Sequence, residues 1–250
     1  MADVPPSERF RDLRLFDTLD STNRYVLDEA RGGAPEGLVA VADRQTAGRG
    51  RRDRSWESPP GASLLVSVLL RPRVGLDRVQ LLTMASSLAM AEAVEDVAGV
   101  RALLKWPNDL VVGPRKLGGV LAEAEVSSAG EVRAVAIGTG LNVTWTEFPP
   151  DLADVATACN LESGRVVDRF DVLRSYLAHL ETRYDALEST ASDYRARLDT
   201  LGRHVRVERV DGPVVGTAVD VGHAGELLVE TGAGCIVEVV AGDVVHLRPS

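Results

Sequence analysis

One short segment of the chain concentrates positive charge. The stretch "TAGRGRRDRSW", residues 46–56, holds four arginines within six positions, interleaved with glycines and followed by Trp56. Glycine lets backbone amides approach a ligand closely, and the planar guanidinium of arginine suits phosphate and carboxylate groups at any working pH. The segment therefore predicts a clamp for a small anion that becomes ordered on binding. A solvated arginine-rich surface loop is the alternative.

A second segment, "KWPNDL" at residues 105–110, combines a strand end with polar side chains. Pro107 cannot extend a sheet ladder, so a strand over 101–105 must stop here. Asn108 and Asp109 are then expected on a turn, where functional side chains are common. Asp109 could hold Mg²⁺, which favours one or two carboxylates together with substrate phosphates. An Asx-type turn that satisfies its own backbone is the alternative.

A third segment, "KLGGVLAE" from residue 116, places Lys116 beside paired glycines at the start of an expected strand. A lysine in that position can reach into a pocket whose floor is bare backbone. The chain has only two lysines, Lys105 and Lys116, and both lie in these candidate segments. That coincidence favours a functional role, although an arginine-rich composition could also produce it.

Two weaker motifs complete the set. In "GTGLNV", residues 138–143, glycines permit close approach, and the amide of Asn142 can donate and accept, as in the recognition of an adenine edge. A β-bulge or a strand end is the alternative. In "DSTN", residues 20–23, Ser21 is a plausible helix N-cap, and Thr22 offers a second hydroxyl to a polar ligand group.

Composition excludes several classes of function. The formal net charge is -9 and 45% of residues are hydrophobic, which indicates a globular protein and opposes general nucleic-acid binding. No segment is apolar enough to span a bilayer, no signal peptide is evident, and Cys159 and Cys235 are expected to be free thiols, so we expect a cytoplasmic protein. No Ser-His-Asp or Cys-His set is apparent, which argues against a protein nucleophile.

The surrounding pattern mixes strands and helices. Short apolar runs predict strands over 37–43, 63–70, 101–105, 118–126 and 132–138. Helices are expected from Ser21 to a C′ residue at Gly32, over 76–99, and from about Asp168 onward. The last region has apolar residues at alternating steps of three and four. A coiled-coil seam fits that spacing, but a helix pair packed on the sheet and broken near "ESTAS" is favoured.

After Gly202 the chain becomes valine-rich and is punctuated by turn signals at 211–212, 223–225 and 232–234. This spacing predicts a small all-β barrel of about five strands. We therefore expect two domains, 1–201 and 202–250. The first is α+β, a mixed sheet with flanking helices, because its elements do not follow a regular βαβ order.

Taken in order, "DSTN", "DRQTAGRGRRDRSW", "KWPNDL", "KLGGVLAE" and "GTGLNV" resemble biotin protein ligase, also called biotin–acetyl-CoA-carboxylase ligase. The resemblance runs from about Phe16 to the end of the chain. It implies a class II synthetase-like catalytic domain followed by an SH3-like barrel. It also implies an enzyme that uses ATP and Mg²⁺ to convert biotin to biotinyl-5′-AMP. Biotin then passes to a lysine of a biotin carboxyl carrier protein domain of acetyl-CoA carboxylase or a related carboxylase.

The resemblance also implies residue roles. Lys116, Arg51 and Asp109 would be catalytic, with Asp109 the candidate Mg²⁺ ligand and proton acceptor. The implied biotin-binding residues are Ser21, Thr22, Asn23, Gln45, Gly48, Arg49, Arg51, Trp56, Lys116 and Gly118. Those implied for ATP and the adenylate are Arg49, Arg51, Arg54, Trp56, Asn108, Lys116 and Asn142.

Two features set this chain apart from the family pattern. Asp53 stands in the arginine loop where the family usually has a small residue, and we expect retained activity with altered loop ordering. Only about 15 residues precede the catalytic region, too few for the helix-turn-helix that some members carry, so no operator binding is expected. We expect a monomer or a weak, ligand-dependent dimer.

Three other functions compete with this expectation. A lipoate or octanoate transferase shares the catalytic fold, and a biotin or nucleotide sensor would lack the chemistry that Lys116 supplies. A nucleic-acid-binding module built on the arginines is opposed by the net charge.

Overall fold

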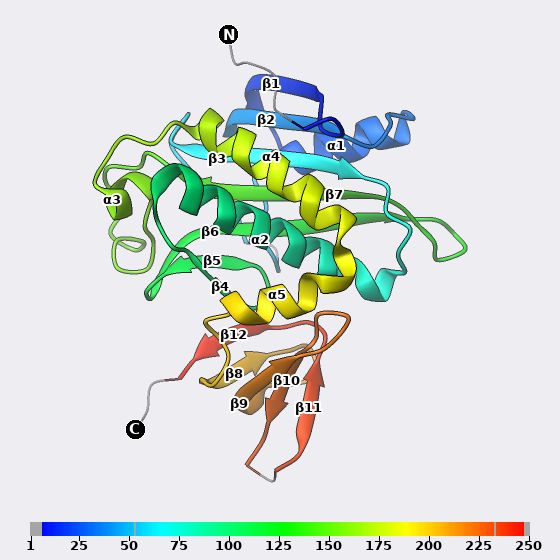
Figure 1. The fold of residues 1–250 in the computed structure, drawn as a ribbon, viewed down its shortest axis with the longest axis vertical. Helices are drawn as coiled ribbons and strands as arrows, with labels where there is room; N and C mark the ends of the chain where they lie inside the picture. The colour runs from blue at the N-terminus through cyan, green and yellow to red at the C-terminus, as the bar shows by residue number, and fades with distance from the viewer. Residues whose placement is uncertain (1–6, 53, 233, 248–250) are drawn as a thin grey trace.

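The computed structural model describes residues 7–52, 54–232 and 234–247. These residues form two sheets, a large one with helices on both faces and a small one at the C-terminal end (Figure 1). The large sheet has seven strands in the order β1-β2-β3-β7-β6-β5-β4. Its strands are β1 (Asp12–Leu19), β2 (Leu38–Gln45), β3 (Ser63–Leu70), β4 (Leu103–Lys105), β5 (Asp109–Val112), β6 (Arg115–Val126) and β7 (Val132–Asn142).

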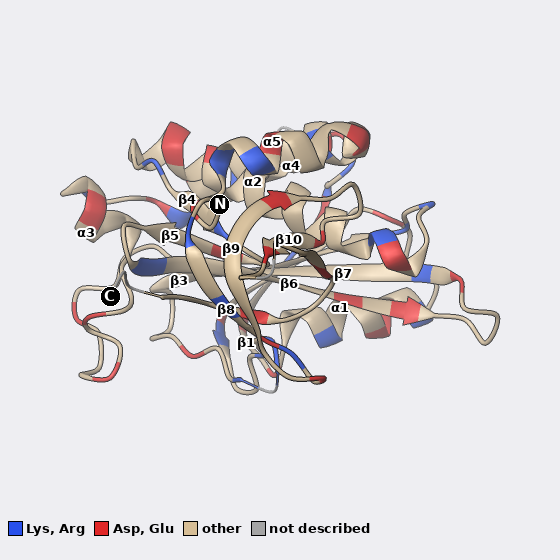
Figure 2. Ribbon diagram, turned by 90° about the horizontal axis from the view of Figure 1, so that it is seen from below, with Lys and Arg blue, Asp and Glu red and all other residues tan. Residues whose placement is uncertain are grey.

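Only the first pair of strands is parallel: β1 and β2 are joined through α1 (Thr22–Arg31), and the other pairs of the sheet are antiparallel. Helix α1 covers one face of the sheet, and α2 (Val79–Ala98), α4 (Arg169–Asp185) and α5 (Thr190–Arg197) cover the other (Figure 2). Short helical pieces complete the domain: η1 (Leu76–Arg78), α3 (Cys159–Ser163) and η2 (Leu187–Ser189). This is the mixed α+β architecture expected from the sequence.

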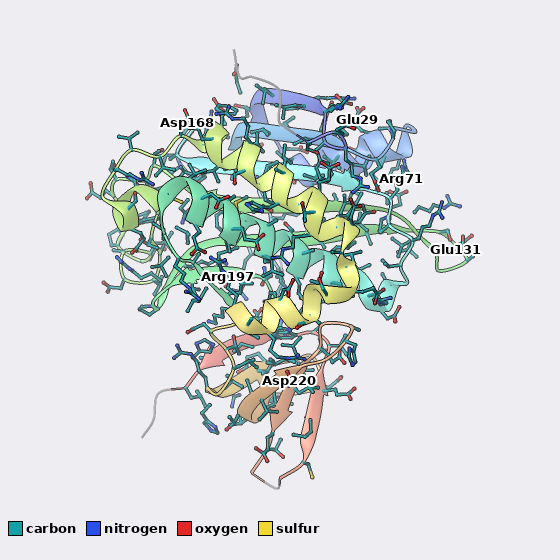
Figure 3. All side chains as sticks on the ribbon, in the orientation of Figure 1. Glu29, Arg71, Glu131, Asp168, Arg197 and Asp220 are labelled. Carbon is teal, nitrogen blue, oxygen red and sulfur yellow. The ribbon has the colours of Figure 1, made fainter. Side chains whose placement is uncertain are left out.

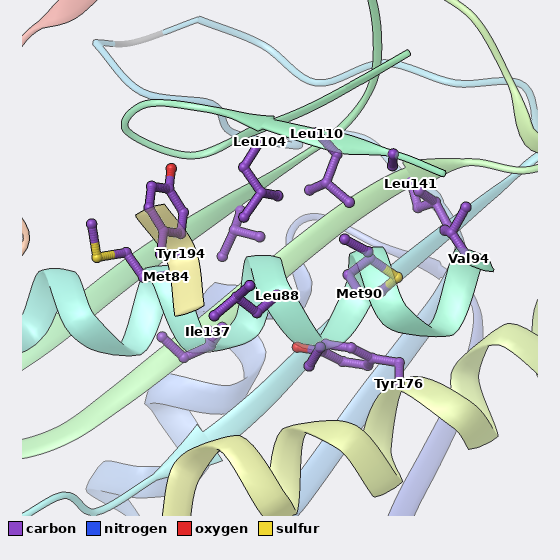
Figure 4. Packing of buried hydrophobic residues seen from close by; sticks show 14 of the residues in the cluster. Met84, Leu88, Met90, Val94, Leu104, Leu110, Ile137, Leu141, Tyr176 and Tyr194 are labelled. Atoms are coloured by element: carbon purple, nitrogen blue, oxygen red, sulfur yellow. The ribbon is translucent and has the colours of Figure 1, made fainter. Parts of the chain in front are cut away.

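The three-layer arrangement explains the sequence of β3. All eight of its residues are buried, because α1 packs below the strand and the α2/α4 layer lies above it. Helix α2 is also buried on most of its surface, which is typical of a helix enclosed within a domain. Its side chains pack between the sheet and the outer helices, as shown for Met84, Leu88 and Met90 in Figure 4.

The helical region after Asp168 is a broken pair, as favoured from its spacing, and not a coiled coil. Asp168 caps α4 by accepting from the amides of Phe170 and Asp171, and the chain bends through η2 before α5. Tyr176 of α4 is fully buried against α2, and its hydroxyl lies 2.9 Å from Ser86 Oγ. The apolar residues that recur at alternating steps of three and four positions therefore form the face of α4 that packs against α2.

The second sheet has five antiparallel strands in the order β11-β10-β9-β8-β12. They are β8 (His204–Glu208), β9 (Val214–Val221), β10 (Leu227–Glu230), β11 (Ile236–Val239) and β12 (Asp243–His246). The expected number of strands is confirmed. The described residues of the three turn signals lie between consecutive strands, with Gly212 and Gly225 at positive φ, which other residues rarely adopt.

Side-chain contacts from α5 hold the two sheets together. Arg197, labelled in Figure 3, donates to the carbonyl of Ala102 at 2.8 Å. Arg195 donates to the carbonyl of Val221 at 2.8 Å. Trp106, which follows β4, is buried, and its Nε1 donates to the carbonyl of Gly225 at 2.9 Å. The helix and the strand end thus both contact the second sheet.

The structure corrects several details of the sequence-based prediction. Strands β1 and β5 and the short helix α3 were not predicted. Gly32 ends α1 in the right-handed region, and Gly33 is the residue at positive φ. Asp109 is the first residue of β5 and does not lie on the turn, and β7 continues through Asn142 instead of ending at Gly138. For the strands, pairing with neighbouring strands extends the ladder further than local residue preferences indicate.

No helix within the described residues is long and apolar enough to cross a membrane. Cys159 is buried, and burial raises the pKa of its thiol to about 12. In the described structure Cys159 and the exposed Cys235 are not joined by a disulfide.

Candidate active site

A cavity of about 450 Å³ opens where the start of α1, the arginine loop, β4 to β7 and strand β12 of the second sheet meet. It collects residues that are far apart in the sequence. The predicted residues that line it are Ser21, Thr22, Asn23, Gln45, Arg49, Arg51, Arg54, Trp56, Asn108, Asp109 and Lys116.

The arginine loop forms a small hairpin over one side of the cavity. Arg49 and Ser55 pair across it, the amide of Gly50 donates to the carbonyl of Arg54 at 2.6 Å, and the amide of Trp56 donates to the carbonyl of Gly48 at 3.0 Å. A Cβ atom on Gly48 would lie 2.4 Å from the Trp56 carbonyl oxygen. Gly48 is therefore required for close approach of two backbone segments. Asp53 lies outside the described residues.

The glycines of the loop do not supply its unusual backbone conformation. Arg52 does, at a φ of 53°, in the left-handed region that non-glycine residues seldom occupy.

One carboxylate of the second sheet faces the arginines. Asp243, the first residue of β12, has an oxygen 4.0 Å from Arg51 Nη1 and another 3.8 Å from Arg52 Nη1, and it also contacts Arg54 Nη2. Burial above all lowers the pKa of Arg51, with further lowering from the charges of Arg52 and Arg54. Arginine still keeps its charge, so the site holds positive charge that a single carboxylate balances only in part.

Lys116 lies at the centre of the cavity. Its Nζ is 2.6 Å from Asp109 Oδ1 and 5.5 Å from the centre of the Trp56 ring. A Cβ atom on Gly140 would lie 2.5 Å from Trp56 Cε2, so that glycine makes room for the indole. The indole Nε1 is buried without a hydrogen-bond partner among the described residues. An apolar wall and an ammonium therefore lie side by side.

The opposite end of the cavity is a network of neutral donors and acceptors. Thr22 Oγ1 donates to Gln45 Oε1 at 3.0 Å, and Ser67 Oγ donates to Asn23 Oδ1 at 2.6 Å. Ser21 caps α1 through the amide of Arg24. These groups are buried at the start of a helix, where a polar, uncharged ligand can exchange hydrogen bonds with them.

Glu123 of β6 joins this polar end to the arginine loop. Its two carboxylate oxygens accept from Asn23 Nδ2 at 2.8 Å and from Arg49 Nη2 at 2.6 Å. A Cβ atom on Gly138 would lie 2.4 Å from Asn23 Oδ1, so the glycine is needed for this approach. Arg49, predicted to contact both biotin and phosphates, is held here by Glu123, so the polar network also contains one ion pair.

Three predicted residues lie outside the lining of the cavity. Gly48 and Gly118 are buried behind it. Asn142 is buried, and its Nδ2 donates to the carbonyl of Thr157 at 3.0 Å. Asn108 lines the cavity, but its Nδ2 already donates to the carbonyl of Val120 at 2.8 Å.

The described residues contain no group of three or more His, Cys, Asp or Glu side chains that could hold a metal ion alone. Asp109 is the carboxylate that lies against Lys116 in this cavity. This donor set fits Mg²⁺ that arrives on phosphates, since Mg²⁺ is usually bound by one or two carboxylates and substrate phosphates.

Sequence reasoning missed Glu123, Ser67 and Asp243. Glu123 is the last residue of the segment "KLGGVLAE", and its position in that motif could have indicated a role in the site. Ser67 is a polar residue in the apolar run of β3. No sequence pattern indicates that Asp243 belongs to the site, because only the docking of the second sheet brings it to the arginine loop.

A cavity between an α+β domain and a small β domain, with a neutral end and a strongly cationic end, defines a ligase that binds a small carboxylic acid beside a nucleotide. A model of the biotin/lipoate A/B protein ligase family matches residues 15–142, and a model of the biotin protein ligase C terminal domain matches residues 200–247. The chain belongs to the biotin protein ligase family.

Individual relatives agree with this assignment. The biotin–[acetyl-CoA-carboxylase] ligase of Mycobacterium tuberculosis is 38% identical over 250 residues, which cover 96% of this chain and 90% of that protein. The bifunctional ligase/repressor BirA of Bacillus subtilis is 34% identical over 229 residues, 89% of this chain and 70% of that protein. The structure of biotin protein ligase from Aquifex aeolicus in complex with biotin and ATP superposes with a TM-score of 0.81 at 29% identity, covering 96% of this chain and 100% of that one.

Proposed function

We propose that this enzyme condenses biotin with ATP to biotinyl-5′-AMP and transfers biotin to a lysine of a carrier domain. The observation that carries the proposal is that Lys116 lines one cavity together with the polar side chains at the start of α1 and the arginine loop, with Trp56 beside it. Biotin has a neutral ureido ring at one end and a carboxylate at the other, and the cavity offers matching chemistry at its two ends.

The neutral end would bind the ureido ring. Thr22, Asn23 and Gln45 present a donor and acceptor network at the start of α1, and biotin would exchange hydrogen bonds with it. The carboxylate would then lie towards Lys116. Trp56, with its ring face near the ammonium, would separate biotin from the nucleotide.

In the first step a carboxylate oxygen of biotin attacks the α-phosphorus of ATP, and the bond from that phosphorus to the bridging oxygen breaks as pyrophosphate leaves. Both reactants are anions, so positive charge fixed in the cavity lowers the barrier. Lys116 and Arg51 supply that charge beside the reacting atoms. Asp109 would hold Mg²⁺ that arrives on the phosphates, and the ion would supply positive charge that stabilises the leaving pyrophosphate.

In the second step the carrier's lysine amine attacks the carbonyl carbon of the mixed anhydride, and AMP leaves. A new amide forms, and the amine loses a proton. Asp109 is the candidate acceptor, as a carboxylate within reach of the amine can be. The closed arginine loop excludes water from the anhydride until the carrier arrives.

The carrier is proposed to be the biotin carboxyl carrier protein domain of acetyl-CoA carboxylase or a related carboxylase. We also propose a cytoplasmic enzyme that is a monomer or a weak dimer formed with ligand bound. Sedimentation with and without biotin and ATP tests the oligomeric state. The division into domains at residues 201 and 202 remains a prediction, testable by limited proteolysis.

The test of function is exchange of labelled pyrophosphate into ATP, measured with biotin, lipoate and octanoate in parallel. Exchange with biotin alone supports the proposal. Exchange only with lipoate or octanoate would assign the chain to the lipoate branch of the family. No exchange with any acid would leave a binding protein, and Asp53→Gly would then show whether the loop residue is the cause.

A further inference from the structure

Lys105 is a cavity residue to which the proposed reaction gives no role. It ends β4, is half-buried, and lines the same cavity as Lys116. Among the cations that line the cavity in the described parts of the chain, it alone has no carboxylate within 4 Å. The others are paired: Arg49 with Glu123, Lys116 with Asp109, and the remaining three arginines with Asp243.

The sheet register fixes where the Lys105 side chain lies. Lys105 is directly opposite Asp109 across the β4–β5 pair, and Asp109 is paired in turn with Lys116 of β6. Directly opposite residues of an antiparallel pair lie on one face of the sheet. The two lysines therefore flank one carboxylate, with Lys105 on the side of β4, the edge strand.

The surroundings of Lys105 leave its charge undercompensated. Burial is the main cause that lowers its pKa, and Lys116 and Arg54 lower it further, whereas Asp109 and Asp199 act in the opposite direction. Placing a cation in such a position is unfavourable unless an anion binds there. The polyanionic part of a nucleotide is the anion that the proposed reaction brings to this cavity.

We propose that Lys105 binds the β- and γ-phosphates of ATP, and so the pyrophosphate that leaves, while Lys116 acts at the biotin carboxylate and the α-phosphate. This inference rests on the proposed function. When the bond between the α-phosphorus and the bridging oxygen breaks, the electron pair stays on pyrophosphate, and the Lys105 ammonium stabilises that added charge. No proton needs to move.

Because Lys105 and Lys116 are assigned different groups, loss of Lys105 should affect the two half-reactions differently. Pyrophosphate takes part in adenylation and in its reverse, but it is absent from the transfer of biotin from biotinyl-5′-AMP to the carrier. A group that touches only the β- and γ-phosphates must affect the first reaction and spare the second. A group that contacts the adenylate or the carrier must affect transfer as well.

The experiment compares the wild-type enzyme with Lys105→Met, Lys105→Arg and Arg115→Met. Arg115 is the matched control, since it is a cation of the same sheet that pairs with Glu162 at 2.7 Å and lies outside the cavity lining. Each enzyme is assayed for biotin-dependent exchange of pyrophosphate into ATP, and separately for transfer from purified biotinyl-5′-AMP to a carrier domain without ATP or pyrophosphate. Far-UV circular dichroism and thermal unfolding verify the fold.

Lys105→Met is expected to raise the KM for pyrophosphate and ATP by about 10- to 100-fold, the loss expected for a charged hydrogen bond, and to leave transfer within about 2-fold. Lys105→Arg should recover part of the loss because it keeps the charge. Equal loss in both assays, or normal exchange in Lys105→Met, would overturn the inference. If the wild-type enzyme shows no exchange, the proposed function itself fails. This result can be distinguished from the two that would overturn the inference about Lys105, because both of those require an active wild-type enzyme.

Discussion

Lys116 Nζ and Asp109 Oδ1 are 2.6 Å apart. The two residues belong to the neighbouring strands β6 and β5, and Gly119 of β6 lies directly opposite Asp109. A Cβ atom on Gly119 would lie 3.3 Å from Asp109 Oδ1 and 3.4 Å from Lys116 Nζ. The paired glycines of the segment "KLGG" thus leave space for an ion pair. This pair places an ammonium and a carboxylate at one point of the cavity.

Lys116→Met is expected to lower both half-reactions, each by about 100-fold or more, because the ammonium stabilises charge in both transition states. Pyrophosphate exchange and transfer from preformed biotinyl-5′-AMP measure the two effects. Lys105→Met is the contrasting variant, since transfer should survive in it. Retention of transfer in Lys116→Met would show that the lysine acts in adenylation alone.

Asp243→Asn is expected to release the arginine loop in the ligand-free protein. Three arginines pair with this one carboxylate, and exposed pairs contribute modestly, so we expect cleavage by trypsin after Arg51, Arg52 or Arg54 to accelerate by about 2- to 10-fold. Mass spectrometry of the fragments gives the rates. Bound adenylate should abolish the difference, because its phosphate replaces the carboxylate.

A matched control for that experiment is Asp220→Asn, which removes an ion pair between Arg195 and Asp220 on another part of the second sheet. It should leave cleavage of the loop unchanged. Equal cleavage rates in wild-type and Asp243→Asn protein would mean that the loop is held by its own backbone hydrogen bonds.

Gly140→Ala is expected to impair ligand binding more than folding. The added methyl group would meet the ring of Trp56 at 2.5 Å, and the half-buried indole, which lines the cavity, must move aside to make room for it. We expect KM for biotin and ATP to rise about 10-fold, with the free energy of unfolding changed by less than about 1 kcal/mol. Gly232→Ala, which meets no atom within 4 Å, should behave as wild type in both measurements.

Trp106→Phe is expected to loosen the contact between the two sheets. The indole donates to the carbonyl of Gly225 at 2.9 Å, and an unpaired buried acceptor costs about 1–3 kcal/mol. Hydrogen exchange should accelerate in the turn between β9 and β10. Trp145→Phe removes a comparable buried bond, to Ser63 Oγ at 3.0 Å, far from that turn. Similar exchange in the two variants would contradict an inter-sheet role.

His246 is expected to make folding stability depend on pH. Burial, followed by the charges of Lys105 and Arg203, lowers its pKa from 6.5 to about 4, and Asp199 opposes this only in part. Between these values the unfolded chain binds a proton that the folded chain does not. The free energy of unfolding should therefore fall as pH drops from 6.5 to 4, by up to about 3 kcal/mol, and then level off.

Urea unfolding at several pH values measures this profile. His246→Gln should flatten it, while His204→Gln, at an exposed position of β8, should leave it unchanged. A profile with the same slope in His246→Gln would assign the dependence to other groups.

Much of the fold follows from local pattern. Strand β3, the long helix α2 with its end at Gly99, the break after α4 and the turns of the second sheet were all predicted from residue type and spacing. These features depend on neighbours in the sequence, where apolar periodicity and backbone preference operate. The order of the five motifs identified the family before any geometry was available, and the family models confirm that identification.

The sequence by itself determined which residue types are present for chemistry, with both lysines and the arginine loop inside candidate motifs. Tertiary structure decided which of them share a cavity and which charges they meet. Asp243 reaches the arginines only because α5 and Trp106 dock the second sheet against the first. Strand register assigns each side chain to a face, so Asn142 donates to Thr157, and Lys105 has no carboxylate within 4 Å among the described residues. Such pairings join residues distant in the chain, and no local preference encodes them.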